Sequence, residues 1–98
     1  MADPTIHVAV LVLEIYIPAA QSLKEKRRVL KSLKDRVRGS FNVSVAEIGE
    51  LEKWQRAMVG FSALSADKSH LNGTMNTLLD FAGEIGQFEI IGHDLQFL

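Results

Sequence analysis

Apolar side chains alternate along four short segments of the chain, which is the pattern of β-strands. The segments comprise residues 5–17, 41–48, 54–64 and 88–97. In the first segment both alternating sets are largely apolar: Ile6, Val8, Val10 and Val12 on one side, and Ala9, Leu11, Leu13, Ile15 and Ile17 on the other. Such a strand is typical of the middle of a sheet that is covered on both faces. We therefore expect residues 5–17 to form a central strand.

Two segments between the strands repeat their apolar residues with the period of an α-helix. In the first, Ser22 and Glu25 fit a capping box at the helix start, and Gly39 is expected to end the helix. Its apolar side consists of Leu23, Val29, Leu30, Leu33 and Val37. The second helix is predicted to begin after Ser65 or Asp67 and to end at Gly86. Its apolar side consists of Leu71, Met75, Leu78, Ala82 and Ile85.

The elements therefore follow one another as strand, helix, strand, strand, helix, strand. Right-handed crossovers place both helices on one face of a four-stranded antiparallel sheet, which is the ferredoxin-like α+β fold. The 98 residues suffice for one hydrophobic core but not for two, so we expect residues 1–98 to form a single domain. The other face of such a sheet is open in a monomer, and the doubly apolar first strand favours self-association, as in a dimer.

Composition places the chain among ordinary globular proteins, with 47% hydrophobic and 23% charged residues. No apolar run reaches the roughly 18 residues of a membrane span, and the first residues lack the features of a secretion signal. The chain contains no cysteine, which excludes disulfides, thiolate nucleophiles and thiolate metal sites. We therefore expect a cytoplasmic protein.

Charge is distributed very unevenly along the chain. Eight basic and two acidic residues lie between Lys24 and Arg38, so this segment carries +6, whereas the three basic and ten acidic residues elsewhere carry −7. Six of these cations share one side of the predicted helix, and we call them the basic arc: Lys24, Arg27, Arg28, Lys31, Lys34 and Arg38. Long cations on one side of a helix can follow a phosphate backbone and release its counterions. The alternative is a solvated helix face, although a face of one sign repels itself.

Lys26 lies apart from the basic arc, in the middle of the apolar side of the same helix. Its side chain can extend along apolar neighbours until the ammonium reaches water. Otherwise the ammonium needs a partner, and Glu47 is one carboxylate that can supply it. Lys26 is therefore either a structural residue or part of a site.

A second group of candidates lies on the two middle strands. Trp54, Gln55 and Arg56 open the third strand, where the indole can stack on a base or anchor an interface between copies of the chain. Asn42, Ser44 and Glu47 alternate on the neighbouring strand and, with Arg56, can line a small polar site. The alternative is that they are ordinary outward-facing residues.

We expect no enzymatic activity, cofactor or metal, because no catalytic or ligating set converges in the sequence. The three histidines, His7, His70 and His93, lie on different elements without metal-ligand spacing. No phosphate-binding glycine loop or nucleophile elbow is present. Residues 56–61 lack the aromatic pattern with which RNA-recognition domains stack bases on their sheet. Residues 18–22 also lack the arginine and glycines of an acylphosphatase loop.

Three motifs resemble the YlxP-like family of small bacterial proteins, long catalogued as a domain of unknown function. They are Ser-Leu-Lys-Glu-Lys-Arg-Arg at residues 22–28, Phe-Asn-Val-Ser-Val-Ala-Glu at 41–47 and Trp-Gln-Arg-Ala at 54–57. The resemblance extends from about Ile6 to Phe97 and implies a ferredoxin-like fold. It also implies an association with RNA or the ribosome, and it supplies no catalytic residues.

Together these features predict a binding module that contacts RNA or the ribosome through the basic arc. The alternative is a homo-oligomeric interaction scaffold that uses the open sheet face and Trp54.

Overall fold

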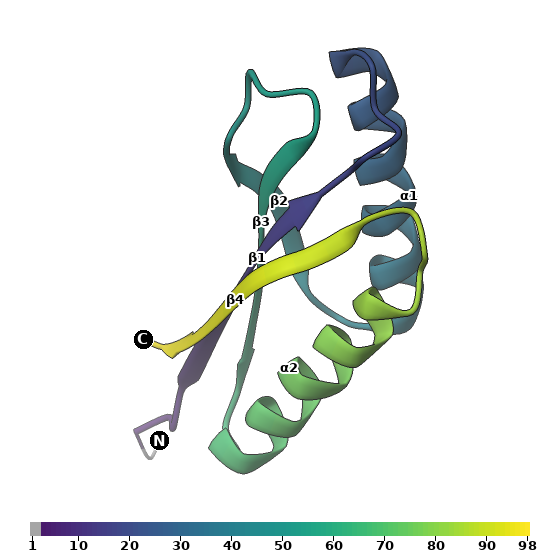
Figure 1. Ribbon diagram of the computed structural model, residues 1–98. Coiled ribbons are helices and arrows are strands. Elements are labelled where there is room, and N and C mark those ends of the chain that lie inside the picture. The colour runs from purple at the N-terminus through teal and green to yellow at the C-terminus, as the bar shows by residue number, and fades with distance from the viewer. Residues whose placement is uncertain (1–2) are drawn as a thin grey trace.

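Four antiparallel strands form one sheet in the order β2-β3-β1-β4, and both helices lie on the same side of it (Figure 1). The computed structural model describes residues 3–98. The elements, in chain order, are β1 (His7–Tyr16), α1 (Leu23–Ser40), β2 (Ser44–Gly49), β3 (Arg56–Ser65), α2 (Lys68–Gly83) and β4 (Glu89–Phe97). This arrangement confirms the predicted ferredoxin-like fold.

β1 occupies the centre of the sheet, as its sequence predicts. It pairs with β3 from His7–Ser65 to Tyr16–Arg56 and with β4 on its other edge, where the register shifts after Glu14. The core lies between the sheet and the helices and includes Leu11, Leu13, Ile15, Val59, Phe61, Leu30, Leu33, Val37, Leu71, Met75 and Leu78. Residues 3–98 cover only this face. Val8, Val10 and Val12 point to the other side, which we call the open face, so these residues do not supply the expected second cover.

Both helices begin at polar caps that the sequence indicates, but their ends differ from expectation. The Glu25 N–H donates to Ser22 Oγ at 3.1 Å, whereas the Glu25 carboxylate accepts from the Gln21 N–H and not from that of Ser22. Asp67 rather than Ser65 caps α2. Gly39 lies inside α1, which continues to Ser40.

The second helix also ends earlier than predicted. α2 stops at Gly83, so Ile85 lies outside it. Gly86 has a φ of +84° in the loop that follows, where glycine avoids the clash that a side chain would meet. No helix among residues 3–98 is long and apolar enough to cross a membrane.

All four strands start later than the alternation predicts; β1 begins at His7 rather than residue 5, and β4 at Glu89 rather than residue 88. β2 begins at Ser44 rather than Phe41, because Phe41 caps the end of α1, where its N–H donates to the Val37 carbonyl at 2.7 Å. Its partly buried ring packs edge-on against Phe81 with centroids 5.4 Å apart. β3 begins at Arg56 rather than Trp54, so Trp54 belongs to the β2–β3 loop. The prediction that the third strand opens at Trp54 and Gln55 is therefore wrong.

Candidate functional site

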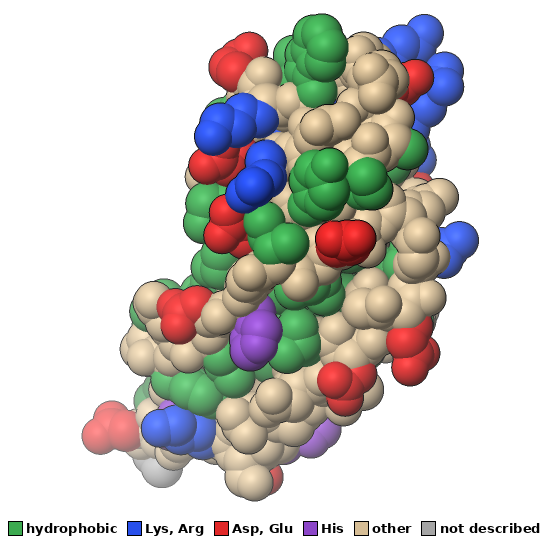
Figure 2. Space-filling model, in the orientation of Figure 1, with side chains coloured by type: hydrophobic (Ala, Val, Ile, Leu, Met, Phe, Trp, Pro, Cys, Tyr) green, Lys and Arg blue, Asp and Glu red, His purple; other side chains and the backbone are tan. Residues whose placement is uncertain are grey.

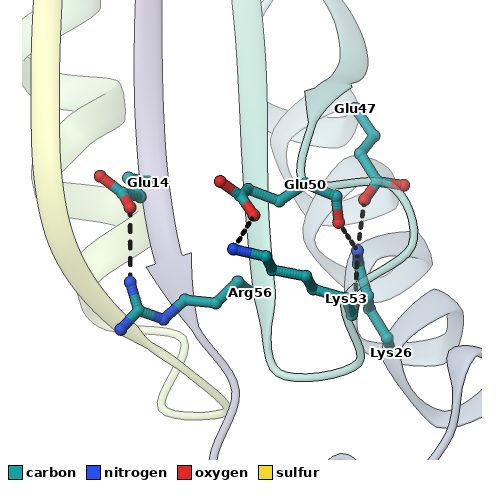
Figure 3. A network of polar contacts seen from close by, with 6 residues as sticks. All are labelled: Glu14, Lys26, Glu47, Glu50, Lys53 and Arg56. Atoms are coloured by element: carbon teal, nitrogen blue, oxygen red, sulfur yellow. Dashed lines mark hydrogen bonds and ion pairs between the residues drawn. The ribbon is translucent and has the colours of Figure 1, made fainter.

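Lys26 holds the start of α1 to the β2–β3 loop (Figure 3). Its side chain is only 1% exposed. The ammonium donates to the carbonyl oxygens of Glu50 and Lys53, each at 2.7 Å, and lies 2.7 Å from Glu47 Oε2. Two hydrogen bonds and one ion pair therefore compensate the charge of the buried ammonium. We call this set the Lys26 clamp, and it shows that Glu47 is the partner that the buried lysine requires.

Glu47 reaches Lys26 because of its position in the sheet. It is opposite Val59 on the helix-covered side of β2 and β3. Its side chain is 18% exposed, and its buried Oε2 accepts no hydrogen bond within the described residues, so the ion pair is its compensation. Beyond Glu47 the chain turns sharply at Glu50, which has a φ of +61°.

Gln55 anchors the other end of the same loop. Its side-chain Nε2 donates to the carbonyl oxygens of Pro18 and Ala20 at 3.1 and 3.2 Å. Its backbone carbonyl accepts from the Ile17 N–H at 2.8 Å. Residues 50–55, which we call the Trp54 loop, are therefore tied to α1 at one end and to the β1–α1 connection at the other. Trp54 lies between these anchors with 53% of its surface exposed.

Two surface ion pairs lie beside the loop (Figure 3). Lys53 Nζ is 2.8 Å from Glu50 Oε2, and its hydrogen bond holds the pKa of the Glu50 carboxyl below its usual range. Arg56 is 3.5 Å from Glu14 Oε1, and its guanidinium lies 5.9 Å from the centroid of the Tyr16 ring. An open hollow of about 420 Å³ at this place is lined by Glu52, Lys53, Trp54, Gln55 and Arg56.

The basic arc is displayed along the outer side of α1, and Figure 2 shows Lys and Arg side chains at the upper right, over this helix. All of its members are exposed except Lys34, which is half-buried. Asp35 is also exposed on this helix and forms an ion pair with Lys31 at 2.7 Å, and this hydrogen bond lowers the pKa of the Asp35 carboxyl. At the far end of the helix, Arg38 Nη2 donates to the Val45 carbonyl of β2 at 3.4 Å.

The predicted small polar site of Asn42, Ser44, Glu47 and Arg56 is not assembled. Ser44 is opposite Ser62 on the open face, whereas Glu47 lies on the helix side. The two residues are three positions apart, and side chains an odd number of positions apart point to opposite faces of a sheet. Arg56 is paired with Tyr16 at the other end of β3. A hollow of about 310 Å³ contains Asn42 and Ser44 but neither charged residue.

Comparison with known proteins places the chain in a family. Residues 8–95 match the model of a family described as "Protein of unknown function (DUF503)". The chain belongs to this family. It is 40% identical to "Uncharacterized protein YlxP" of Bacillus subtilis (strain 168) over 76 residues, which cover 78% of this chain and 83% of that protein. The matched region contains nearly all of the sheet and both helices, so the clamp, the Trp54 loop and the basic arc lie within the part that defines the family.

The geometry divides the motif residues of this DUF503 protein into two sets. Ser22, Lys26, Glu47 and Gln55 have structural contacts inside the fold. Lys24, Arg27, Arg28 and Trp54 face solvent. The sequence indicated Lys26 through its place among apolar residues, but it gave no sign that two backbone carbonyls would accept from it.

Among residues 3–98 no group of three His, Cys, Asp or Glu side chains lies close enough to hold a metal ion. A groove of about 520 Å³ lies between the β1–α1 connection and the start of β4, with Arg28, Val29 and Phe88 among its lining residues. The sequence did not indicate this groove, since its walls come from three separate segments.

Proposed function

We propose that the protein is a small cytoplasmic binding module that contacts structured RNA, in particular ribosomal RNA, through the basic arc of α1. The observation that carries the proposal is the display of these cations on one helix side, which is not used for packing. Among residues 3–98, Lys24, Arg27 and Arg28 form no ion pair with a carboxylate. They are therefore available to an anionic partner.

The dimensions of the arc suit a nucleic-acid backbone. At about 1.5 Å rise per residue, Lys24 and Arg38 are separated by roughly 21 Å along the helix, a length comparable to several successive phosphates. Three of the six cations are arginines, whose planar guanidinium groups bind phosphate oxygens through two hydrogen bonds. The Lys31–Asp35 pair lowers the net charge of the arc, so the strongest contacts are expected near the start of the helix.

The proposal is tested by measuring how binding to ribosomal RNA fragments depends on salt. The first variant changes Arg27, Arg28, Lys31 and Lys34 together to Gln. Fluorescence anisotropy at several salt concentrations should show weaker binding and a flatter slope, by about 0.7 to 0.9 for each phosphate contact removed. Unchanged affinity in this variant, or no binding by the wild type at low salt, refutes the proposal.

A matched pair of variants separates the basic arc from net charge alone. Lys24→Gln with Arg27→Gln removes two charges from the arc, whereas Arg36→Gln with Lys68→Gln removes two exposed charges elsewhere. Both pairs change the net charge equally, so nonspecific attraction predicts equal losses. Binding through the arc predicts that only the first pair weakens the complex substantially.

A second candidate function, a homo-oligomeric scaffold, is favoured by the exposed apolar residues of the sheet. Leu64, which is opposite Val8 on the open face, is 73% exposed, and Ile48 is also exposed. Apolar surface of this kind is often covered by a partner, and a second copy would bury the row of valines on β1. Sedimentation velocity of the wild type, of Leu64→Lys and of Trp54→Ala tests this. A wild type that stays monomeric at high concentration excludes the scaffold.

A further inference from the structure

Trp54 is the sole tryptophan of the chain and is half exposed on an anchored segment. We propose that Trp54 stacks on an unpaired base of the RNA whose phosphates contact the basic arc. This inference rests on the proposed function and names its substrate class: a stem whose paired part lies along α1, next to a loop or bulge. It gives the Lys26 clamp a functional consequence, because the clamp positions the indole.

The backbone on either side of Trp54 is held in place before any ligand arrives. The Lys53 carbonyl accepts from Lys26, and Gln55 is held by three hydrogen bonds to the β1–α1 connection. An aromatic side chain on a preorganised backbone loses little conformational freedom when it binds. Trp54 is thus presented to solvent by a rigid loop.

The surroundings of Trp54 suit a nucleotide better than a second protein chain. The hollow beside the indole is lined by Glu52 and by Lys53 and Arg56, which also pair with Glu50 and Glu14. The centres of protein–protein interfaces are depleted of lysine and glutamate, whereas a stacked base brings a phosphate that attracts cations. The indole face supplies the flat apolar surface on which bases of any sequence stack.

The loop and one flank of the basic arc lie on the β2 side of α1. Arg38 at one end of α1 donates to Val45 at the start of β2, and Lys26 at the other end donates to the loop that follows β2. Arg27 is related to Arg38 by three helical turns, so it lies on the same flank of the helix, near the loop. Figure 1 shows the β2–β3 loop beside the N-terminal end of α1.

An aromatic side chain on a projecting loop requires an unpaired base. In an A-form stem the bases are stacked inside and the deep groove is too narrow for side chains, whereas loops and bulges expose base faces. Phosphates of the stem can then contact α1 while the neighbouring unpaired base reaches Trp54. Glu52 is exposed in the same loop and repels the backbone, so Glu52→Gln is expected to strengthen binding slightly.

The test uses the fluorescence of the single tryptophan. An RNA hairpin with an unpaired loop and a blunt duplex with the same stem are each titrated into the protein, and fluorescence and anisotropy are recorded together. Stacking predicts that the hairpin quenches Trp54 on saturation and that the duplex does not. Trp54→Ala should reduce affinity for the hairpin about tenfold or more, leave the duplex unaffected and keep the salt slope, and Trp54→Phe should restore part of the loss.

Leu51→Ala is the matched control, because Leu51 is 55% exposed in the same loop and has no flat face on which a base stacks. It should bind both RNAs as the wild type does. RNA binding that depends on the basic arc but neither quenches Trp54 nor weakens in Trp54→Ala overturns the stacking while the proposed function stands. Absence of any RNA binding overturns both. A Trp54 signal that changes with protein concentration alone, together with a dimer in sedimentation, assigns the indole to a second copy and overturns the inference.

Discussion

Replacing Lys26 by Met tests whether the clamp stabilises the fold. Methionine keeps an unbranched stem and similar helix propensity, but it removes the ammonium that serves Glu47 and the carbonyls of Glu50 and Lys53. Removing one partner of a buried ion pair costs about 3–5 kcal/mol, because the other charge stays buried and unpaired. Glu47 is 18% exposed, so water can reach it, and we expect the lower end, about 3 kcal/mol.

Such a loss is a large part of the roughly 5–15 kcal/mol that stabilises a domain of this kind. It should lower the melting temperature by about 15 °C, given about 4–8 °C for each kcal/mol in a domain of this size. Urea denaturation followed by far-UV circular dichroism measures the change, and the slope of the unfolding free energy should stay the same. Lys31→Met is the matched control on the same helix, since Lys31 is 77% exposed, and it should behave as the wild type.

The double variant Lys26→Met with Glu47→Leu separates the ion pair from the rest of the clamp. Replacing both charges by apolar side chains removes the unpaired carboxylate, so part of the loss should be recovered. The two loop carbonyls would still lack their donor, at about 1 kcal/mol each. A Lys26→Met variant that loses less than about 1 kcal/mol, or a double variant no more stable than the single one, would refute this account.

Further predictions concern the glycines, an ion pair and a cap. Gly86→Ala should cost about 1 kcal/mol because of its positive φ, whereas Gly39→Ala, inside α1 with free space around it, should add about 0.5 kcal/mol in urea denaturation. Lys53 lowers the pKa of Glu50 in the folded protein, so the ionised Glu50 carboxylate stabilises the fold above the ordinary pKa of glutamate. This stabilisation is lost as the pH falls through the pKa that Glu50 has in the folded protein. Lys53→Met should raise the pKa of Glu50 in a ¹³C NMR titration. Asp67→Ala removes the cap of α2 and should lower the melting temperature by an amount equivalent to about 1 kcal/mol.

The order of elements, the central position of β1 and the buried faces of both helices could be predicted from the sequence alone. These features depend on the periodicity of apolar residues, which neighbouring positions encode directly. The same reasoning singled out Lys26, because a lysine in the middle of an apolar helix face is an exception to that periodicity. It also gave Glu47 as a partner, and the structure shows the contact at 2.7 Å.

Only the tertiary structure decided what completes that contact and where Trp54 lies. The other two acceptors of Lys26 are backbone carbonyls, which every residue possesses, at separations of 24 and 27 positions in the chain. The alternation of apolar side chains includes Trp54 and predicts that the third strand begins there. In the structure Trp54 belongs to the anchored loop, and β3 begins two residues later. Side-chain periodicity is a local property of the chain, whereas these contacts form only once the crossover brings the start of α1 against the end of β2.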